Sequence, residues 1–201
     1  FDDIISANQF RGLQSQKNKL LILRHDCERD LEKALVMAKI ESQVEVRSTY
    51  FIRVHSEYYN LLQHSERETI KNLQKLGMEI GLHYEPVFYA KEKLSLLDGI
   101  KSDVDVLERI IGRKITSISA HQPLLADVNF REISSCWMDM YVDSRIKNIP
   151  YYSDSGMAWR EKSLRQISAD PETCQLLIHP DFWNEKEISW AENLQNLIVQ
   201  R

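Results

Sequence analysis

Short apolar runs alternate with helical patterns along most of the chain, from about residue 19 onward. Apolar residues recur at the three- to four-residue spacing of an amphipathic helix over 31–41, 66–76, 92–111 and 188–199. Between these segments, apolar runs predict strands over 20–23, 48–54, 78–82, 115–120, 140–142 and 175–178. A short strand or loop is expected at 151–156. This alternation favours parallel strands joined by crossover helices.

The number of strand–helix units, about six to seven, predicts one closed or nearly closed α/β barrel. No repeat, low-complexity segment or Gly/Ser/Pro-rich linker divides the chain, so residues 1–201 are predicted to form a single domain, with 1–18 as an N-terminal lead-in. An open, doubly wound sheet is the alternative. The first strand-to-helix turn has no glycine, so the fingerprints of dinucleotide and P-loop sites are absent.

Composition narrows the range of partners. The chain is 43% hydrophobic and 28% charged, which is enough for one sizeable core. The net charge is −4, the pI is about 5.9, and basic residues are scattered among acidic ones, so we expect no nucleic-acid partner. No apolar run approaches the roughly 20 residues that span a bilayer, so we expect no membrane span.

The chain begins without Met, and Phe1-Asp2-Asp3 lacks the basic and apolar blocks of a signal peptide. The three cysteines, Cys27, Cys136 and Cys174, are an odd number without metal-ligand spacing. This pattern predicts reduced thiols and therefore a cytoplasmic location.

Five of the six histidines lie at, or one residue from, the end of a short apolar run. Three of these runs end in polar clusters, at 24–28, 82–85 and 178–181. Because parallel strands finish at a common rim of a barrel or sheet, we expect these clusters to converge. Imidazole and carboxylate groups at one rim can hold a divalent metal, transfer protons, or do both. The pattern therefore predicts a metallohydrolase.

The first cluster contains two carboxylates, Asp26 and Glu28, two positions apart. On an extended segment both face one side, whereas His25 and Cys27 face the other. One carboxylate can then ligate a metal while the other accepts a proton from water. The alternative is that the cluster only caps the following helix. Several residues separate Asp26 from that helix, which weakens this alternative.

His83, His121 and His179 each end a predicted strand, and each lies close to a following proline. Proline ends a strand by removing a backbone donor and fixing φ, so each ring is expected on a defined turn. A single histidine at such a place could equally be a core residue. Three repeats of the pattern indicate a site, whereas His55 and His64 lie in polar surroundings and are predicted on the surface.

The order of these motifs resembles a divergent branch of the NodB-type polysaccharide deacetylases, a carbohydrate esterase family. The motifs are Arg24-His25-Asp26-Cys27-Glu28, Glu79-Ile80-Gly81-Leu82-His83-Tyr84-Glu85 and His179-Pro180. The resemblance extends from Leu20 to Trp183. It implies a distorted (β/α)7 barrel that uses a divalent metal to remove N- or O-linked acetyl groups from sugars. We expect this metal to be zinc, with other divalent ions as the alternative.

The resemblance also implies roles for individual residues. Asp26 matches the catalytic base, His179 the general acid and His83 the first metal-binding histidine. The metal-binding aspartate is Cys27 in the strict register and Glu28 in the variant with a one-residue spacer. We prefer Glu28, because it shares a face with Asp26.

The chain departs from the family pattern at Val87, where a second metal-binding histidine is usual. The arginine expected in the fourth unit is also replaced, and His121 lies there as a substitute metal ligand or oxyanion partner. Polar and aromatic residues are expected to contact the substrate, namely Arg24, His25, Tyr84, Glu85, Asp154 and Arg160.

The leading hypothesis is a metal-dependent hydrolase that removes an acetyl or other acyl group from an amino sugar or a surface-polysaccharide precursor. The ligands would be Glu28, His83 and His121. The alternative is a catalytically inactive barrel that binds a carbohydrate. It is motivated by Val87, which replaces the second histidine of the family pattern, and by Cys27, which replaces its aspartate in the strict register. A barrel phosphoesterase is a third candidate, although such sites normally contain more histidines and carboxylates.

Overall fold

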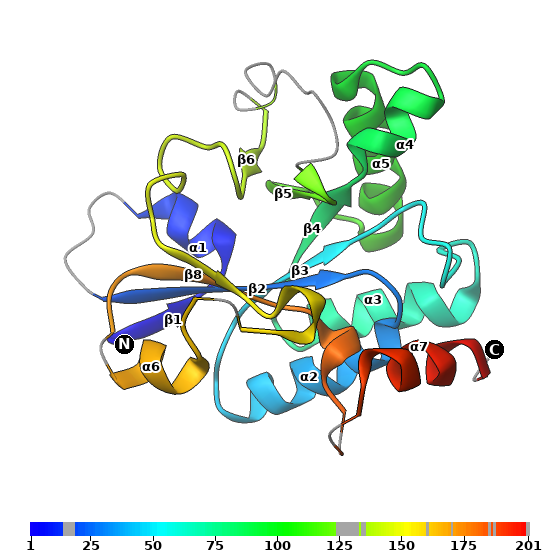
Figure 1. Cartoon of the computed structure of the whole chain (residues 1–201). Helices are drawn as coiled ribbons and strands as arrows, with labels where there is room; N and C mark the ends of the chain where they lie inside the picture. The colour runs from blue at the N-terminus through cyan, green and yellow to red at the C-terminus, as the bar shows by residue number, and fades with distance from the viewer. Residues whose placement is uncertain are drawn as a thin grey trace.

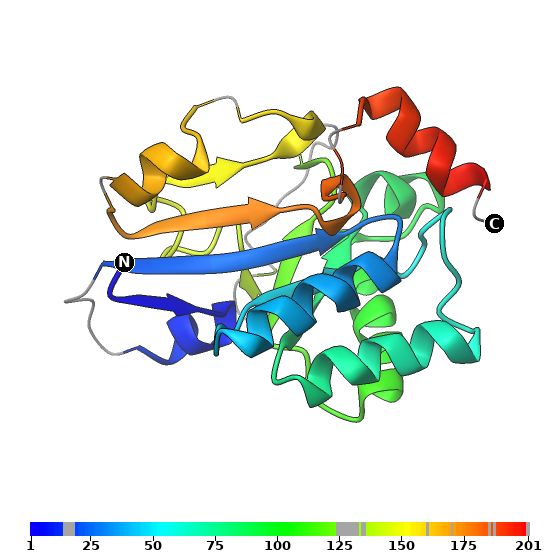
Figure 2. The ribbon, with the colours of Figure 1, turned by 90° about the horizontal axis from the view of Figure 1, so that it is seen from below.

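The chain folds around a curled parallel β-sheet (Figures 1 and 2). The computed structural model describes residues 1–13, 19–123, 133, 136–159, 161–169, 171–184, 186 and 188–199. The strands are β1 Asp3–Ile5, β2 Leu20–Cys27, β3 Thr49–Ile52, β4 Glu79–Tyr84, β5 Ser117–Ala120, β6 Met138–Asp139, β7 Tyr151–Ser153 and β8 Cys174–Ile178. The helices are α1 Ala7–Gly12, α2 Leu31–Gln43, α3 His64–Lys75, α4 Pro86–Lys91, α5 Leu96–Ile111, α6 Leu164–Ala169 and α7 Trp190–Val199, with 3-10 turns η3 Ser155–Met157 and η4 Pro180–Phe182.

Seven strands lie in the order β6-β5-β4-β3-β2-β8-β7, and every adjacent pair is parallel. Strand β1 pairs with the beginning of β2, along the edge that β3 occupies further on. Among the described residues no pairing joins β6 to β7, so the sheet is a half-barrel that stays open between them. The predicted distorted seven-stranded α/β fold is confirmed.

The described residues form three hydrophobic clusters, and two of them show how the side chains alternate between the two sides of the sheet. Ile22 on β2 and Phe51 on β3 pack with Met138 on β6 and with Met140. Two strands separate β6 from β3 in the sheet, so this cluster fills the concave side of the curl. The larger core lies on the convex side, where strand residues such as Tyr50 pack against residues of α2, α3 and α5. Figure 2 shows α2 and α3 side by side across the strands. None of the helices in the described part of the chain is long and apolar enough to span a bilayer.

Three local predictions need correction. The lead-in contains β1 and α1, and α1 begins at Ala7, after its N-cap Ser6, which forms a capping box. The predicted helix 92–111 begins only at Leu96, after its N-cap Ser95, and the separate helix α4 precedes it. The predicted strand 140–142 is a turn, because the Asp139 carboxylate accepts hydrogen bonds from the backbone N–H groups of the two residues at 141 and 142.

Gly81 allows β4 to pack closely against β3 on the concave side. A Cβ atom at this position would lie 2.5 Å from the ring of Phe51 and 2.9 Å from the carbonyl oxygen of Ser117. Both neighbours are fully buried, so neither can move without disturbing the inner core. The glycine is therefore required by space rather than by backbone conformation.

We predict that Gly81→Ala lowers the free energy of unfolding by about 1–3 kcal/mol, as overpacking of a tight core does. Urea denaturation followed by circular dichroism measures this change. Gly12→Ala is the matched control, because its Cβ would meet nothing within 4 Å, and it should cause no loss of stability. An equal stability of the Gly81→Ala variant and the wild type would contradict the close packing described here.

Candidate metal and acid–base site

The inward-facing positions of four strands place polar side chains at one rim. Ile22 on β2 faces the inner core, so Arg24 and Asp26 face the same side. On β4 the same alternation carries from Gly81 to His83. Contacts between strands agree with this placement: the Asp26 Oδ2 atom lies 3.3 Å from Ser119 Oγ and 3.8 Å from His83 Nδ1. The carboxyl-terminal ends of the strands therefore converge on one site.

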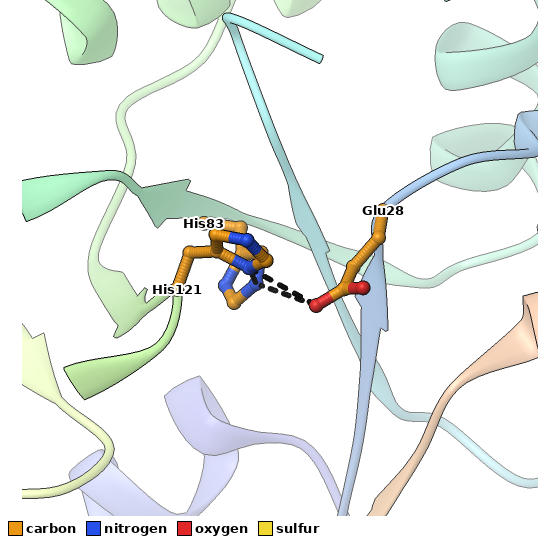
Figure 3. A group of neighbouring side chains, drawn as sticks. All are labelled: Glu28, His83 and His121. Carbon is orange, nitrogen blue, oxygen red and sulfur yellow. Dashed lines mark hydrogen bonds and ion pairs between the residues drawn. The ribbon is translucent and has the colours of Figure 1, made fainter. Parts of the chain in front are cut away.

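Glu28, His83 and His121 form a compact group whose side chains point toward one another (Figure 3). The Glu28 Oε1 atom lies 3.0 Å from His121 Nδ1 and 3.7 Å from His83 Nε2, and the two ring nitrogens are 3.1 Å apart. One ligand atom from each residue lies within 4.8 Å of the others, so the group could hold a metal ion. We call it the ligand triad.

The tautomer of His83 is set by the backbone. Its Nδ1 atom lies 3.1 Å from the carbonyl oxygen of Ser119, and a carbonyl can only accept a hydrogen bond, so Nδ1 carries the proton. The Nε2 lone pair is then directed at the triad. This pairing of a ligand ring with a carbonyl is the usual outer-shell arrangement in metal sites.

The pKa shifts of Glu28 and His121 favour the protonation states that bind a metal cation. Burial raises the pKa of Glu28, but its contacts with His121 and His83 outweigh this effect, and the pKa lies well below its usual value. Burial, with the nearby His83, lowers the pKa of His121 despite its hydrogen bond to Glu28. An ionised carboxylate and neutral imidazoles are the forms that bind a metal.

Asp26 lies beside the triad and is almost completely buried. Its Oδ2 atom is held by the Ser119 hydroxyl and faces the Arg24 guanidinium at 3.7 Å. The Oδ1 atom has no hydrogen-bond partner among the described residues. Asp26 therefore has one anchored oxygen and one buried oxygen without a protein partner among the described residues.

Arg24 is fully buried beneath this carboxylate. Its Nη2 atom donates to the Tyr141 hydroxyl at 2.7 Å, and its guanidinium lies 4.6 Å from the centroid of the Tyr141 ring and 5.4 Å from that of Tyr151. Buried arginine needs such aromatic faces and a nearby anion. Arg24, expected to contact substrate, is instead placed to orient Asp26 from below.

His179 follows β8 and is held by Asp154. The His179 Nδ1 atom lies 2.7 Å from Asp154 Oδ1, and the backbone N–H of His179 donates to the same carboxylate. The indole N–H of Trp183 donates to Asp154 Oδ2 at 3.0 Å. Burial lowers the pKa of His179, but the hydrogen bond to Asp154 and its charge, aided by Asp26 and Glu28, raise it overall. Asp154, expected among the substrate contacts, acts on His179.

Asp181 is a residue of the site that the sequence analysis missed. It is fully buried and accepts hydrogen bonds from the backbone N–H groups of residues 28, 29 and 30. This links the turn after β8 to the loop that carries Glu28. The signal available in the sequence was its spacing, because Asp181 follows His179 by two positions.

Two other residues expected to contact substrate lie on the convex side. His25 is fully buried, with Nε2 2.7 Å from Glu41 Oε1 and Nδ1 3.1 Å from the carbonyl oxygen of Ile178. Tyr84 is also fully buried, and its hydroxyl donates to Asp139. Strand alternation turns both away from the site, because each precedes or follows an inward-facing residue. Arg160 lies outside the described residues.

Two cavities open at the triad. The reactive cavity, about 280 Å³ in volume, is lined by Asp26, Glu28, His83 and His179, with Tyr141, Phe182 and Trp190 among its aromatic residues. The second cavity, about 330 Å³, is lined by Glu28, His121, Glu85 and residues of the loop after β3. His55, predicted as a surface residue, is half-buried and lines this second cavity. His64 lies at the exposed start of α3.

Comparison by sequence finds no relative: no family model matches the chain, and no curated protein matches it. Comparison by structure finds similar proteins. A wild-type CE4 family pseudoenzyme from Bacillus anthracis matches with a TM-score of 0.58 at 14% identity, covering 92% of this chain and 61% of that chain. A mutant of that pseudoenzyme with restored enzymatic activity matches with a TM-score of 0.59 at 14% identity, covering 92% and 63%.

Two deacetylases match similarly. The chitin deacetylase of the fungal pathogen Colletotrichum lindemuthianum has a TM-score of 0.58 at 17% identity and covers 94% of this chain and 84% of that chain. The peptidoglycan deacetylase of Bacillus subtilis has a TM-score of 0.54 at 15% identity and covers 92% and 85%. The chain therefore has the fold of the CE4 polysaccharide deacetylases, as the motif resemblance implies, and it spans less than two thirds of the length of the pseudoenzyme chains.

We predict that the ligand triad binds one Zn²⁺ per chain and that His83→Ala weakens binding by more than about 100-fold, since loss of a direct ligand should exceed the 10- to 100-fold effect of an outer-shell change. Isothermal titration calorimetry with Zn²⁺ measures the affinity. His64→Ala is the control, because His64 is exposed and remote from the triad. Equal Zn²⁺ affinity of the His83→Ala and His64→Ala variants would show that the ion does not bind at the triad.

Proposed function

We propose that the chain is a metal-dependent carbohydrate deacetylase that removes an acetyl or other acyl group from an amino sugar or a surface-polysaccharide precursor. One observation carries the proposal: a carboxylate, a carboxylate-held histidine and two ligands of a metal-ready triad line the same cavity. The fold shared with chitin and peptidoglycan deacetylases supports this choice of reaction. A barrel phosphoesterase lacks such support.

The donor set of the triad fits a divalent ion such as zinc. It offers one carboxylate oxygen and two imidazole nitrogens, and the His83–Ser119 contact directs the Nε2 lone pair inward. Three protein ligands leave a coordination position open, which is typical of catalytic rather than structural zinc sites. A bound ion would supply Lewis-acid chemistry, lowering the pKa of water and stabilising negative charge on the acyl oxygen.

Hydrolysis breaks the bond between the acyl carbon and the sugar nitrogen or oxygen, and water supplies the new oxygen. Asp26 accepts one proton of that water at Oδ1, the oxygen without a partner. His179 donates a proton to the leaving nitrogen or oxygen from Nε2, since Nδ1 is held by Asp154. The raised pKa of His179 keeps the ring protonated closer to neutral pH.

The walls of the reactive cavity suit a sugar ring. Tyr141, Phe182 and Trp190 present aromatic faces, and the side chains of Ser155 and Gln122 offer hydrogen-bonding groups. Trp190 is 43% exposed, so part of its ring is open to a ligand. An apolar face beside polar groups is how small-molecule sites combine affinity with orientation.

A second candidate function is a barrel that binds carbohydrate without catalysis. It is favoured by the match to a CE4 pseudoenzyme and by Val87, which stands where the family pattern has a second histidine. Sugar binding by calorimetry without stoichiometric metal or turnover would support this candidate. Stoichiometric metal together with turnover would exclude it.

We predict that the metal-loaded protein releases acetate from N-acetylated amino sugars or their oligomers and that Asp26→Asn lowers kcat by about 10²- to 10⁴-fold, as loss of a general base does. A coupled acetate assay measures the rate. Asp105→Asn, an exposed change on α5, is the control and should keep full activity. Absence of activity across acetylated sugars would overturn the proposed reaction, and full activity of Asp26→Asn would overturn the assignment of the base.

We predict that Asp154→Asn moves the alkaline limb of the kcat profile to lower pH by about one unit or more. The charge of Asp154 raises the pKa of His179, so its removal makes His179 lose its proton at lower pH. The pH profiles of the variant, of Asp105→Asn and of the wild type provide the comparison. A lower kcat with an unmoved alkaline limb would show that His179 is not the acid.

A further inference from the structure

The second cavity lies beside the ligand triad and away from the acid and base. Glu28, Arg29 and Gln122 line both cavities, so the two meet at the triad. Among the described residues, neither Asp26 nor His179 lines the second one. A ligand whose reacting group lies in the reactive cavity can therefore extend past Glu28 into a space that takes no part in the chemistry.

Basic side chains from three separate segments face this second cavity. Arg29 comes from the loop after β2, Arg53 and His55 from the loop after β3, and Lys91 from the end of α4. Because segments far apart in sequence contribute, the cluster is a product of the fold and not of one charged stretch of chain. Guanidinium, ammonium and imidazolium groups offer many N–H donors to oxygen anions.

Three carboxylates also line the cavity, those of Glu28, Glu57 and Glu85, and the first and last of them are held by basic residues. Glu85 forms an ion pair with Arg53, and Glu28 contacts His121 and, at 3.5 Å, Arg29. Arg53 also lines the cavity, so its guanidinium is held at the cavity wall by a carboxylate on one side.

His55 lies at the cavity with a buried carboxylate behind it. Its ring stacks on Phe88 with centroids 3.8 Å apart, and its Nε2 atom lies 2.8 Å from Asp103 Oδ1. Asp103 is buried and also accepts a hydrogen bond from Tyr89. Burial lowers the pKa of His55, but the hydrogen bond and charge of Asp103 raise it overall. Asp103 does not line the cavity, whereas His55 does, so the imidazole lies at the cavity wall with its carboxylate partner behind it.

We infer that the second cavity binds an anionic group of the substrate, a carboxylate or a phosphate carried near the acylated sugar. The inference rests on the proposed function and narrows its substrate to an acidic glycan or a sugar phosphate. Oxygen anions with several acceptor sites match the converging N–H donors, whereas a neutral hydroxyl would gain only one or two hydrogen bonds there.

Calorimetry with three probes tests this subsite without turnover. Methyl β-glucuronide carries a carboxylate, glucose 1-phosphate carries a phosphate, and methyl β-glucoside is the neutral reference. We expect at least one anionic probe to bind 10-fold or more tightly than the glucoside, and the stronger of the two identifies the source of the charge. Equal affinity for all three probes would overturn the inference.

Lys91→Glu locates the binding. Lys91 is exposed at the end of α4, so the change should not disturb folding, and we expect the affinity for the preferred anion to fall about 5- to 10-fold. Lys93→Glu is the control, because Lys93 is exposed two residues later and does not line the cavity. Equal effects of both changes would show that only general surface charge is involved.

A repeat after chelator treatment separates this subsite from the triad. We expect the preference for the anion to persist, whereas its disappearance would mean that the anion simply ligates a metal ion. Binding and turnover also fail independently. Acetate release from neutral sugars without a preference for anions would contradict only the anion subsite. Anion binding that depends on Lys91, without acetate release, would contradict only the proposed reaction.

Discussion

The register of β2 with its two neighbours is the constraint on which the site depends. Asp26 pairs with Phe51 of β3, and on the other edge His25 pairs with Ile178 of β8. This pairing brings Asp26 and His179 to the same height of the sheet, although about 150 residues separate them in sequence. A slip of one residue would turn Asp26 to the convex side and His25 inward. Backbone pairing thus determines which polar groups meet.

The inner core fixes the depth of the site. Ile22, Phe51 and the two methionines fill the concave side below Arg24, and Gly81 admits the Phe51 ring without a gap. The polar residues of the site, from Arg24 to the rim, lie above this apolar floor. A charge deeper in the curl would lose water without gaining a partner. The reactive groups therefore lie where the sheet ends and water still reaches them.

The sequence predicted most of the fold because its signals are local and periodic. Apolar runs located β2, β3, β4, β5 and β8, and Gly112 marked the end of α5 in the left-handed conformation. Prediction from the sequence failed where a single long-range contact or side-chain contact determines the local structure. Residues 3–5 form a strand because β2 offers them an open edge, and Asp139 turns the chain after only two strand residues. Neither effect leaves a periodic pattern.

The same contrast between local signals and long-range contacts applies to the candidate site. Alternation on β2 was sufficient to pair Asp26 with Glu28 and to separate both from His25, and the same rule applied to β4 separates Tyr84 from His83. The partners of these residues could not be predicted in this way. Asp154 contacts His179 from 25 positions away, and Asp181 holds the loop of Glu28 across 153 positions.

These unpredicted contacts determine the chemistry. A histidine at a strand end has an ordinary pKa and a free tautomer until a carboxylate or a carbonyl fixes them. His83 acquires its metal-facing nitrogen from the backbone of Ser119, and His179 acquires its raised pKa from Asp154. In the proposed function, two similar rings thus become a ligand and an acid through one neighbour each. The strand ends supply the residue types, and the neighbours brought by the fold assign them different roles.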